Sequence, residues 1–379
     1  MLTQRQVDKL RSVRAPEASV LSLYLTLPPD QGSLRDIPAR AAELIARAAA
    51  GSIATGSVAT GSVAASLLSS EDEQLARGVL AARGQEWLGQ TVAIFACAQI
   101  GLLEAVLLPC TPATSGSVEH AVVAVRPHVR PLLAALQRSP AHWIVAVDDR
   151  DAWLLAVAED GVEPVGRVPG HGGWYGPASY HAGQRLTDLA RYPYRDAAAL
   201  LTRIAGPHGR QPLVIGGRTD GIRDLLAELP DELRASYAGC FTADADSLTL
   251  VRARDLAAPV IAHWCEQRER ALVSELIFAA ADGTTSPPGT AVAGLTACLA
   301  AVAASRAGLL LVRDDAMVPG YHCERCDALS LSSDGCADWG AASRPVPDLL
   351  EEMVRKTLAD GGDVVSARSV PSDVAARLR

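Results

Sequence analysis

The sequence predicts a protein of α/β class with three domains. Its 379 residues exceed what one ordinary hydrophobic core accommodates, so two or three domains are the natural expectation. Hydrophobic residues make up 49% of the chain and charged residues 21%, which is typical of globular rather than disordered proteins. Segments with the pattern of strands alternate with helical segments along the chain. This order predicts helices packed in layers on sheets.

The first predicted domain covers residues 1–138. Residues 20–27 alternate partly between apolar and polar side chains, as a strand does, and two prolines end the run. The sequence further predicts helices at 35–50 and 71–83 and strands at 91–96 and 101–108.

The second predicted domain covers residues 139–278. It opens with three strands between residues 143 and 168, and an Asp160-Gly161 pair favours a tight hairpin turn between the last two. After a glycine-rich loop the sequence predicts a helix through Arg203, a strand and tight turn at 212–217, a helix at 221–229 and a closing helix at 256–276.

The third predicted domain covers residues 279–379. The sequence predicts a helix at 292–305, a buried strand at 308–312, a helix at 347–359 and a last strand at 364–366. In the helix at 347–359 the acidic residues come early and Arg355-Lys356 late, which suits the helix dipole.

The charge of the chain restricts its partners. A net charge of −8 argues against a broad DNA-binding surface, because phosphate binding needs clustered Lys and Arg, but local basic patches can still contact RNA. The first residues lack the apolar core of a secretion signal, and the apolar run at 291–305 is too short for a membrane span. We therefore expect a cytoplasmic protein that binds neither DNA nor a membrane.

A cysteine knuckle is the first motif with chemistry. Cys323 and Cys326 have the CxxC spacing that supplies two ligands of a tetrahedral zinc, and Cys336 follows ten residues later. The second half of such a site is incomplete, so His322 or Asp338 would have to serve as the fourth ligand. A structural zinc, a redox-active CxxC and a metal-free loop all remain open.

The glycine-rich loop at 169–177 is the second motif. Four glycines in seven residues allow close approach to another molecule, and the aromatic pair Trp174-Tyr175 can stack on an unpaired base. Alternatively, Trp174 folds back onto its own domain. The helix that follows carries Arg185, Arg191 and Arg195, which form either a solvated face or a phosphate-binding stripe.

Two further groups of residues permit both a functional and a purely structural interpretation. Arg126, His128, Arg130 and Arg138 form either a solvated surface, which the pattern favours, or a phosphate-binding cluster. Gly216-Gly217 after an apolar strand suggests a phosphate cradle, but it lacks the P-loop Lys and Ser/Thr, so a structural turn is favoured. No motif of a hydrolase is present, and we assign no catalytic residue.

The order of these features resembles the archaeal and eukaryotic class I release factors and Pelota, and more closely the bacterial branch of that family, which includes the hibernation factor Balon. The hairpin at 143–168, the glycine-rich loop and the basic helix match the family's middle domain. Gly172-Gly173 stands where the family has the first two residues of its Gly-Gly-Gln motif. The knuckle at 321–326 and the later helix and strand match its last domain. The resemblance covers about residues 140–379, and the N-terminal part matches only the bacterial branch, at residues 20–29 and 84–108.

The resemblance implies a three-domain architecture with an RNase H-like middle domain. It also implies a kink-turn-binding, ribosomal-protein-like α/β/α domain at the C-terminal end, with a degenerate zinc ribbon. In release factors the glutamine helps water attack the peptidyl-tRNA ester in the peptidyl transferase centre. Here Trp174 takes that position and offers no side-chain amide. The resemblance therefore implies a non-hydrolytic factor of hibernation or rescue type, which binds the A site of idle or stalled ribosomes and regulates translation.

The resemblance also implies the partners and the contact residues. The partners are the 70S ribosome with its rRNA and a translational GTPase such as elongation factor Tu. Gly172, Gly173 and Trp174 would form the loop in the peptidyl transferase centre, and the rRNA-binding candidates are His171, Tyr175, Arg185, Arg191 and Arg195. The candidate zinc ligands are Cys323, Cys326, Cys336 and His322.

Two other functions remain open. The backbone N–H of Trp174 can still stabilise an oxyanion, which would make the protein a peptidyl-tRNA hydrolase that rescues stalled ribosomes. A third interpretation keeps the fold and removes the ribosome, leaving an RNA- or protein-binding stress factor.

Overall fold

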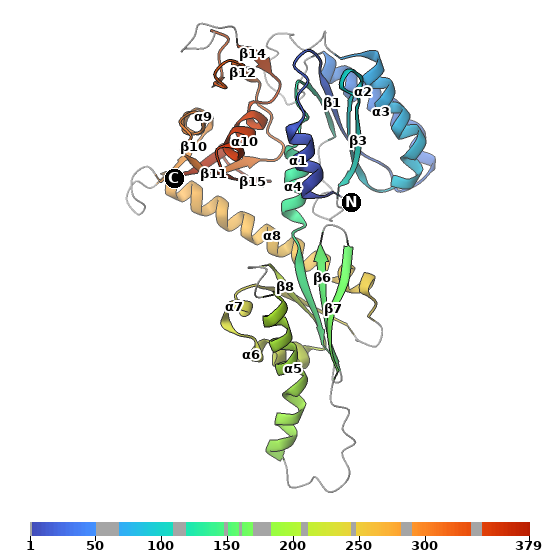
Figure 1. Ribbon diagram of the computed structural model, residues 1–379, viewed down its shortest axis with the longest axis vertical. Helices are drawn as coiled ribbons and strands as arrows, with labels where there is room; N and C mark the ends of the chain where they lie inside the picture. Colours follow the sequence, from blue (N-terminus) through green and yellow to red (C-terminus); the bar gives the residue numbers. More distant parts are fainter. Residues whose placement is uncertain are drawn as a thin grey trace. The chain divides into compact units, whose positions relative to one another are not determined.

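A computed structural model describes residues 2–50, 68–108, 119–147, 151–158, 161–169, 183–205, 211–243, 248–281, 290–334 and 343–379, with backbone only at 169 and 183–193 (Figure 1). The chain divides into two compact units, one made of residues 1–137 and 269–379 and the other of residues 138–268. The first and last predicted domains therefore lie in one unit. The division into three domains, at 138/139 and 278/279, stays a prediction.

The N-terminal part of the first unit is an antiparallel sheet in the order β3-β2-β1-β4. Its elements are α1 (Gln4–Ser12), β1 (Val20–Thr26), η1 (Gly32–Asp36), α2 (Ile37–Ala49), α3 (Ser70–Arg83), η2 (Gly84–Trp87), β2 (Thr91–Cys97), η3 (Ala98–Ile100), β3 (Leu102–Leu108), β4 (His120–Ala124) and α4 (Arg130–Arg138). Helix α1 begins with a capping box, in which the Thr3 hydroxyl accepts from the N–H of Gln6 at 3.3 Å and the Gln6 side chain accepts from the N–H of Thr3 at 2.9 Å.

Alternation along the strands gives this sheet two buried faces. Leu21, Leu23 and Leu25 of β1 pack with α2 and α3. Val20 and Tyr24 point to the other face, where α1 and α4 cover them. The core on that second face continues into the C-terminal part through Leu310 and other side chains, which explains why the two parts form one unit.

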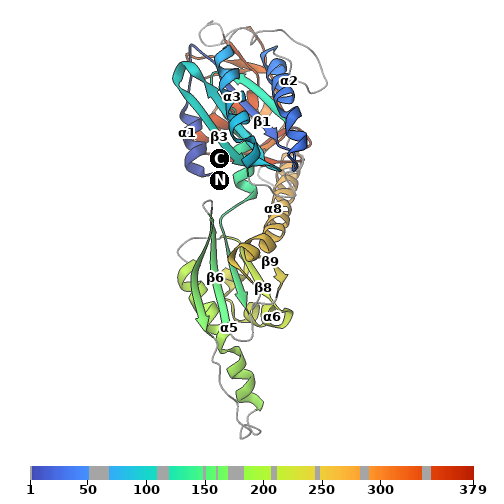
Figure 2. The ribbon, with the colours of Figure 1, turned by 90° about the vertical axis from the view of Figure 1, so that its right-hand side faces the viewer.

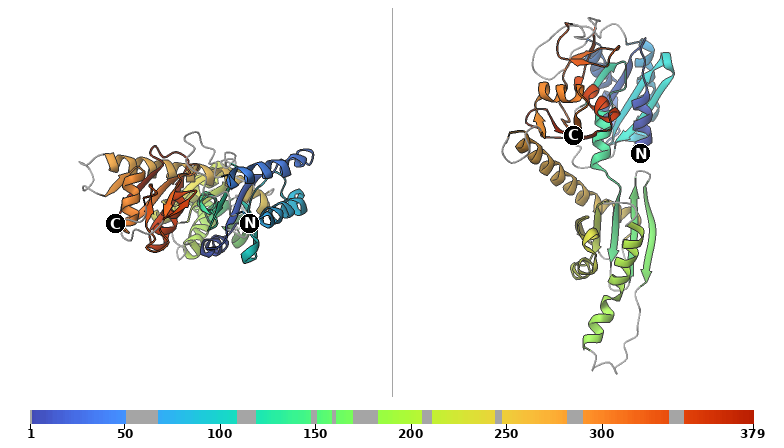
Figure 3. Two further views of the ribbon diagram at one scale, coloured as in Figure 1. Left: turned by 90° about the horizontal axis from the view of Figure 1, so that it is seen from above. Right: turned by 60° about the vertical axis from the view of Figure 1, so that its left-hand side comes forward.

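The C-terminal part is a mixed sheet in the order β10-β16-β11-β15. Its elements are β10 (Ala291–Ala293), α9 (Leu295–Ala303), β11 (Ala307–Arg313), α10 (Leu349–Ala359), β15 (Asp363–Ala367) and β16 (Val374–Leu378). Helices α9 and α10 cover one face, and the last turns of α8 (Leu250–Ala281) lie on the other (Figure 3). There Leu276 packs against the sheet. A second, small sheet in the order β13-β12-β14 carries the knuckle, with strands β12 (Gly320–His322), β13 (Leu329–Ser330) and β14 (Arg344–Val346).

The second unit is built on a five-stranded sheet in the order β7-β6-β5-β8-β9. Its elements are β5 (His142–Val147), β6 (Asp151–Ala158), β7 (Gly161–Pro169), α5 (Gly183–Ala205), β8 (Leu213–Gly217), α6 (Thr219–Glu228), α7 (Asp231–Arg234) and β9 (Tyr237–Thr242). Strands β5, β6 and β7 pair antiparallel, whereas β5, β8 and β9 pair parallel. Helices α5 and α6 cover one face and the first part of α8 the other, and α5 projects past the end of the sheet (Figure 2).

The α/β class that the sequence predicts is confirmed, with sheets and helices in layers. The helix predicted at 292–305 is wrong in its first part, because residues 291–293 form the edge strand β10 and Gly294, at φ 90°, precedes the helix. The closing helix is longer than predicted and runs from Leu250 to Ala281.

None of the helices in the described part of the chain has both the length and the apolar character that crossing a lipid bilayer requires.

Candidate functional site

The predicted peptidyl-transferase-centre loop lies outside the described residues, which resume at 183. This holds for His171, Gly172, Gly173, Trp174 and Tyr175. Arg185 and Arg191 lie on α5, where only the backbone is described. Arg195 is the rRNA-binding candidate with a described side chain, and its Nε lies 3.1 Å from Oε2 of Glu228 on α6. That ion pair links α5 to α6 and leaves Arg195 half exposed.

The predicted zinc ligands lie on the small sheet. Cys323 is buried and Cys326 half-buried, in a turn that the N–H of Asp327 closes on the carbonyl of Cys323 at 2.9 Å. His322 places its Nε2 2.7 Å from Oδ1 of Asp327. Cys336 lies outside the described residues. The knuckle cysteines therefore share one turn, while the ring of His322 is paired with a carboxylate.

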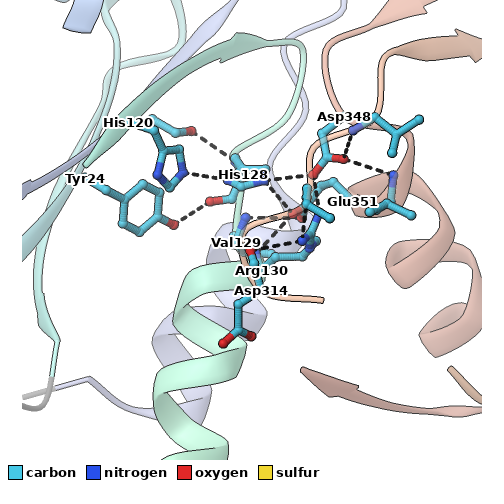
Figure 4. Close-up of polar contacts among 12 residues, drawn as sticks. Tyr24, His120, His128, Val129, Arg130, Asp314, Asp348 and Glu351 are labelled. Atoms are coloured by element: carbon cyan, nitrogen blue, oxygen red, sulfur yellow. Dashed lines mark hydrogen bonds and ion pairs between the residues drawn. The ribbon is translucent and has the colours of Figure 1, made fainter. Parts of the chain in front are cut away.

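A buried charged network connects the N-terminal and C-terminal parts of the first unit (Figure 4). The Nη1 of Arg130, at the start of α4, lies 2.5 Å from Oδ2 of Asp348, which precedes α10. The Nε2 of His128 lies 3.1 Å from the same oxygen. The side chains of Arg130, Asp348 and His128 are 4%, 1% and 5% exposed, so this is a buried ion pair rather than a surface one.

The charges in this network have the further hydrogen bonds that a buried ion pair needs. Arg130 Nη2 donates to the carbonyl oxygens of Arg313, Asp314 and Ala316 at 2.8, 3.2 and 2.9 Å. Asp348 Oδ1 accepts from the N–H groups of Val318 and Leu350 at 3.3 and 3.1 Å, and the second of these bonds caps α10.

Glu351, on the first turn of α10, caps a helix far from it in sequence. Its two carboxylate oxygens accept from the N–H of Val129 at 3.1 Å and of Arg130 at 3.0 Å. These N–H groups belong to the start of α4, where a helix leaves its first donors unpaired and its dipole favours a negative charge. A residue of the C-terminal part therefore completes a helix of the N-terminal part.

Burial raises the pKa of both carboxyl groups, but the net shifts of the two pKa values have opposite signs. Burial alone would raise the pKa of Asp348, but the charge of Arg130 and the hydrogen bond from His128 outweigh it and hold this pKa below its usual value. For Glu351 burial prevails, so its pKa is raised even though His128 and Arg130 lie near. Arg130 therefore compensates Asp348 more completely than it does Glu351.

Hydrogen bonds and an aromatic stack fix the position of His128 (Figure 4). The hydroxyl of Tyr24 donates to the carbonyl of His128 at 2.5 Å, and Oγ of Ser22 accepts from its N–H at 3.0 Å. The rings of Tyr24 and His120 stack with centroids 4.7 Å apart, and Nε2 of His120 lies 3.4 Å from Nδ1 of His128. Burial raises the pKa of Tyr24, so its hydroxyl remains a donor.

The contacts of this network fit an interaction that holds two parts of the fold together better than they fit a metal-binding site. His128, Asp348 and Glu351 offer ligand atoms within 4.8 Å of one another. However, the guanidinium of Arg130 already occupies Oδ2 of Asp348, and backbone N–H groups occupy both oxygens of Glu351. A divalent cation would face a fixed positive charge there.

The network also corrects the expectation for the basic cluster at 126–138. We expected Arg126, His128, Arg130 and Arg138 on a solvated or phosphate-binding surface, yet His128 and Arg130 are buried and paired with carboxylates. The partners of His128 and Arg130 lie some 220 positions later in the chain, where no local pattern points to them.

A comparison with protein families identifies the family of the middle segment of the chain. Residues 127–269 match the sequence model of the bacterial archaeo-eukaryotic release factor family 10. This segment belongs to that family. The resemblance to the bacterial branch of the release factors is thereby confirmed over the matched residues, which include the whole second unit and the glycine-rich loop. No curated protein matches the chain in sequence.

Solved structures show a looser likeness to this release-factor-like chain. The archaeal translation termination factor aRF1 is 14% identical over 99% of this chain and 96% of its own, with a TM-score of 0.27. Pelota of Archaeoglobus fulgidus is 14% identical over 77% and 80%, with a TM-score of 0.36. Dom34 of S. cerevisiae is 8% identical over 76% and 79%, with a TM-score of 0.40.

Proposed function

We propose that the protein is a ribosome-associated factor that occupies the A site of idle or stalled ribosomes without hydrolysing peptidyl-tRNA. One observation carries this function: within a segment of a release factor family, Trp174 follows Gly172-Gly173 where release factors have a catalytic glutamine. An indole offers a large stacking surface and one N–H donor, and it has no amide with which to orient water. The residue therefore suits binding to exposed bases better than ester hydrolysis.

The proposed partners follow from the same site. The 70S ribosome and its rRNA would be bound by the loop and by α5, on which Arg185, Arg191 and Arg195 lie. A translational GTPase such as elongation factor Tu would act beside the protein. A cytoplasmic location accompanies this function.

Replacing Trp174 with alanine is expected to weaken ribosome binding about tenfold, because stacking on one base contributes about 1–3 kcal/mol. The measurement is co-sedimentation of the purified full-length protein with 70S ribosomes over a salt series. Trp153→Ala is the matched control, because Trp153 is an exposed tryptophan of the same unit that stacks under Arg167 and lies on β6. Equal ribosome binding by both variants would remove the stacking role.

The same preparations decide between occupation and hydrolysis. The proposal predicts no release of peptide from stalled ribosome complexes beyond that of buffer. Peptide release that Gly173→Ala abolishes would instead establish the hydrolytic alternative, in which the backbone N–H of Trp174 stabilises the oxyanion. If the protein is absent from every ribosomal fraction at low salt, the third interpretation, an RNA- or protein-binding stress factor, is favoured.

A structural zinc remains part of the proposal. Cys323 and Cys326 share one turn and Cys336 would complete their side of the site, whereas His322, whose Nε2 is paired with Asp327, would have to serve through Nδ1. We predict about one zinc per chain in the purified protein, and loss of that zinc together with a lower melting temperature in Cys323→Ser. Cys240→Ser is the control, because Cys240 is an exposed cysteine on β9. A metal-free protein that melts as before in Cys323→Ser would establish the metal-free loop.

A further inference from the structure

A cluster of basic side chains gathers where the N-terminal and C-terminal parts of the first unit meet near the knuckle. The junction cluster consists of Arg14, Arg126, Arg344, Arg355 and Lys356. Arg14 and Arg126 lie on neighbouring segments, because the N–H of Ala15 donates to the carbonyl of Val125 at 2.8 Å. These five residues come from separate places in the sequence, so only the fold assembles them.

The carboxylates within the cluster are shared among its cations. Glu324 Oε1 lies 3.2 Å from Arg14 Nη2 and 3.1 Å from Arg344 Nη1. Asp327 lies 2.5 Å from Arg355 and 3.8 Å from Lys356, and it also accepts from His322. Glu352 pairs with Arg355 at 2.7 Å. The basic side chains therefore outnumber the carboxylates that face them, on a chain whose net charge is −8.

Arg126 is the member that these carboxylates do not neutralise. It is half-buried, and among the described residues no ion pair or side-chain hydrogen bond engages its guanidinium. Burial and the charges of Arg355 and Arg14 lower its pKa, although Glu352 and Asp327 act in the opposite direction. An anion that docked against Arg126 would remove this repulsion.

We infer that the junction cluster is a binding surface for an RNA phosphate backbone, with Arg126 as its central contact. A guanidinium matches phosphate with two parallel hydrogen bonds, and four of the five side chains are arginines. On a chain whose net charge is −8, this local excess of positive charge would attract a polyanion. The inference rests on the proposed function insofar as the RNA is ribosomal.

The variant that tests this surface is Arg126→Gln in the full-length protein, with poly(U) RNA as the probe. We expect affinity for poly(U) to fall about tenfold at low salt, as when one charge-assisted contact is lost. The slope of log affinity against log salt should flatten by about 0.7, the value for one phosphate contact on a single strand. The melting temperature should stay constant or rise, because the substitution removes a cation from among other cations.

The controls separate RNA binding from folding and from general charge. Arg47→Gln makes the same charge change on α2, at an exposed residue 3.9 Å from Glu43, and should leave poly(U) binding unchanged. Lys356→Gln is a second cluster variant, and it should weaken poly(U) binding as well. Equal affinity of Arg126→Gln, Lys356→Gln and Arg47→Gln for poly(U) would overturn the surface. Binding of polyglutamate that also depends on Arg126 would make the partner an acidic protein and overturn the RNA assignment.

Co-sedimentation with 70S ribosomes distinguishes this inference from the proposed function. Binding of poly(U) through Arg126 without any binding of ribosomes would retain the surface and remove the ribosomal function. In the opposite case, the wild type binds ribosomes, Arg126→Gln binds them equally well, and the salt slope on poly(U) is unchanged. The proposed function would then stand, and the junction cluster would not be an RNA-binding surface.

Discussion

Replacing Asp348 with alanine is expected to destabilise the first unit by about 3–5 kcal/mol, the range for breaking a buried ion pair on one side. The substitution leaves the guanidinium of Arg130, 4% exposed, without its carboxylate. It also removes the acceptor of His128 Nε2 and the cap of α10. An uncompensated buried charge is the larger part of this effect, since losing a helix cap costs only about 1 kcal/mol.

Amide hydrogen exchange measures this effect locally. In Asp348→Ala, peptides from α4 and α10 should lose protection, because the network joins these helices, whereas peptides from β8 in the second unit should stay protected. Asp315→Ala is the matched surface variant, because Asp315 is exposed and pairs with Arg313 at 2.7 Å, and it should change little.

A double variant tests whether the charge or the cap dominates. Arg130→Met with Asp348→Asn removes both charges, and Asn can still cap α10. This double variant should be more stable than Asp348→Ala alone. If it is as unstable as Asp348→Ala, the charge argument is wrong and the network stabilises the fold mainly through its hydrogen bonds.

The sequence predicted well those elements whose pattern is local. Strands β5 and β6 are short apolar runs, and the Asp160-Gly161 pair marks the turn into β7. Helix α10 has apolar periodicity with a cap and charges placed for its dipole. The family resemblance rested on the same stretch and is confirmed for residues 127–269.

The rest of the fold depends on contacts between distant segments. Strand β16 at Val374–Leu378 was not predicted, because its residues fit a strand only as neighbours of β11 and β10. His128 was expected on a solvated or phosphate-binding surface, yet it is buried, and the hydroxyl of Tyr24 donates to its carbonyl oxygen. A buried Arg130 looks like a surface residue in sequence, since its partner Asp348 follows 218 positions later.

The paired glycines are the last two residues of β8, and their packing bears on the function of this motif. Gly216 and Gly217 permitted a phosphate cradle or a structural turn. A Cβ on Gly216 would lie 2.2 Å from the ring of Phe241, and a Cβ on Gly217 would lie 2.2 Å from the carbonyl oxygen of Val147. Both positions are therefore closed by the protein itself, which favours a structural role at the end of β8 over a phosphate cradle.

Replacing Gly217 with alanine is accordingly expected to destabilise the second unit by about 2–6 kcal/mol. The residue has φ 145°, a conformation that disfavours a side chain by about 1–3 kcal/mol, and the clash with Val147 adds about 1–3 kcal/mol more. Gly161 separates the two contributions, because it has φ 149° and nothing within 4 Å of its Cβ position. Gly161→Ala should therefore show the conformational part alone, about 1–3 kcal/mol, in urea unfolding followed by tryptophan fluorescence. Equal destabilisation by the two variants would mean that the sheet yields at Val147, and a Gly217→Ala protein as stable as wild type would reopen the turn to a bound phosphate.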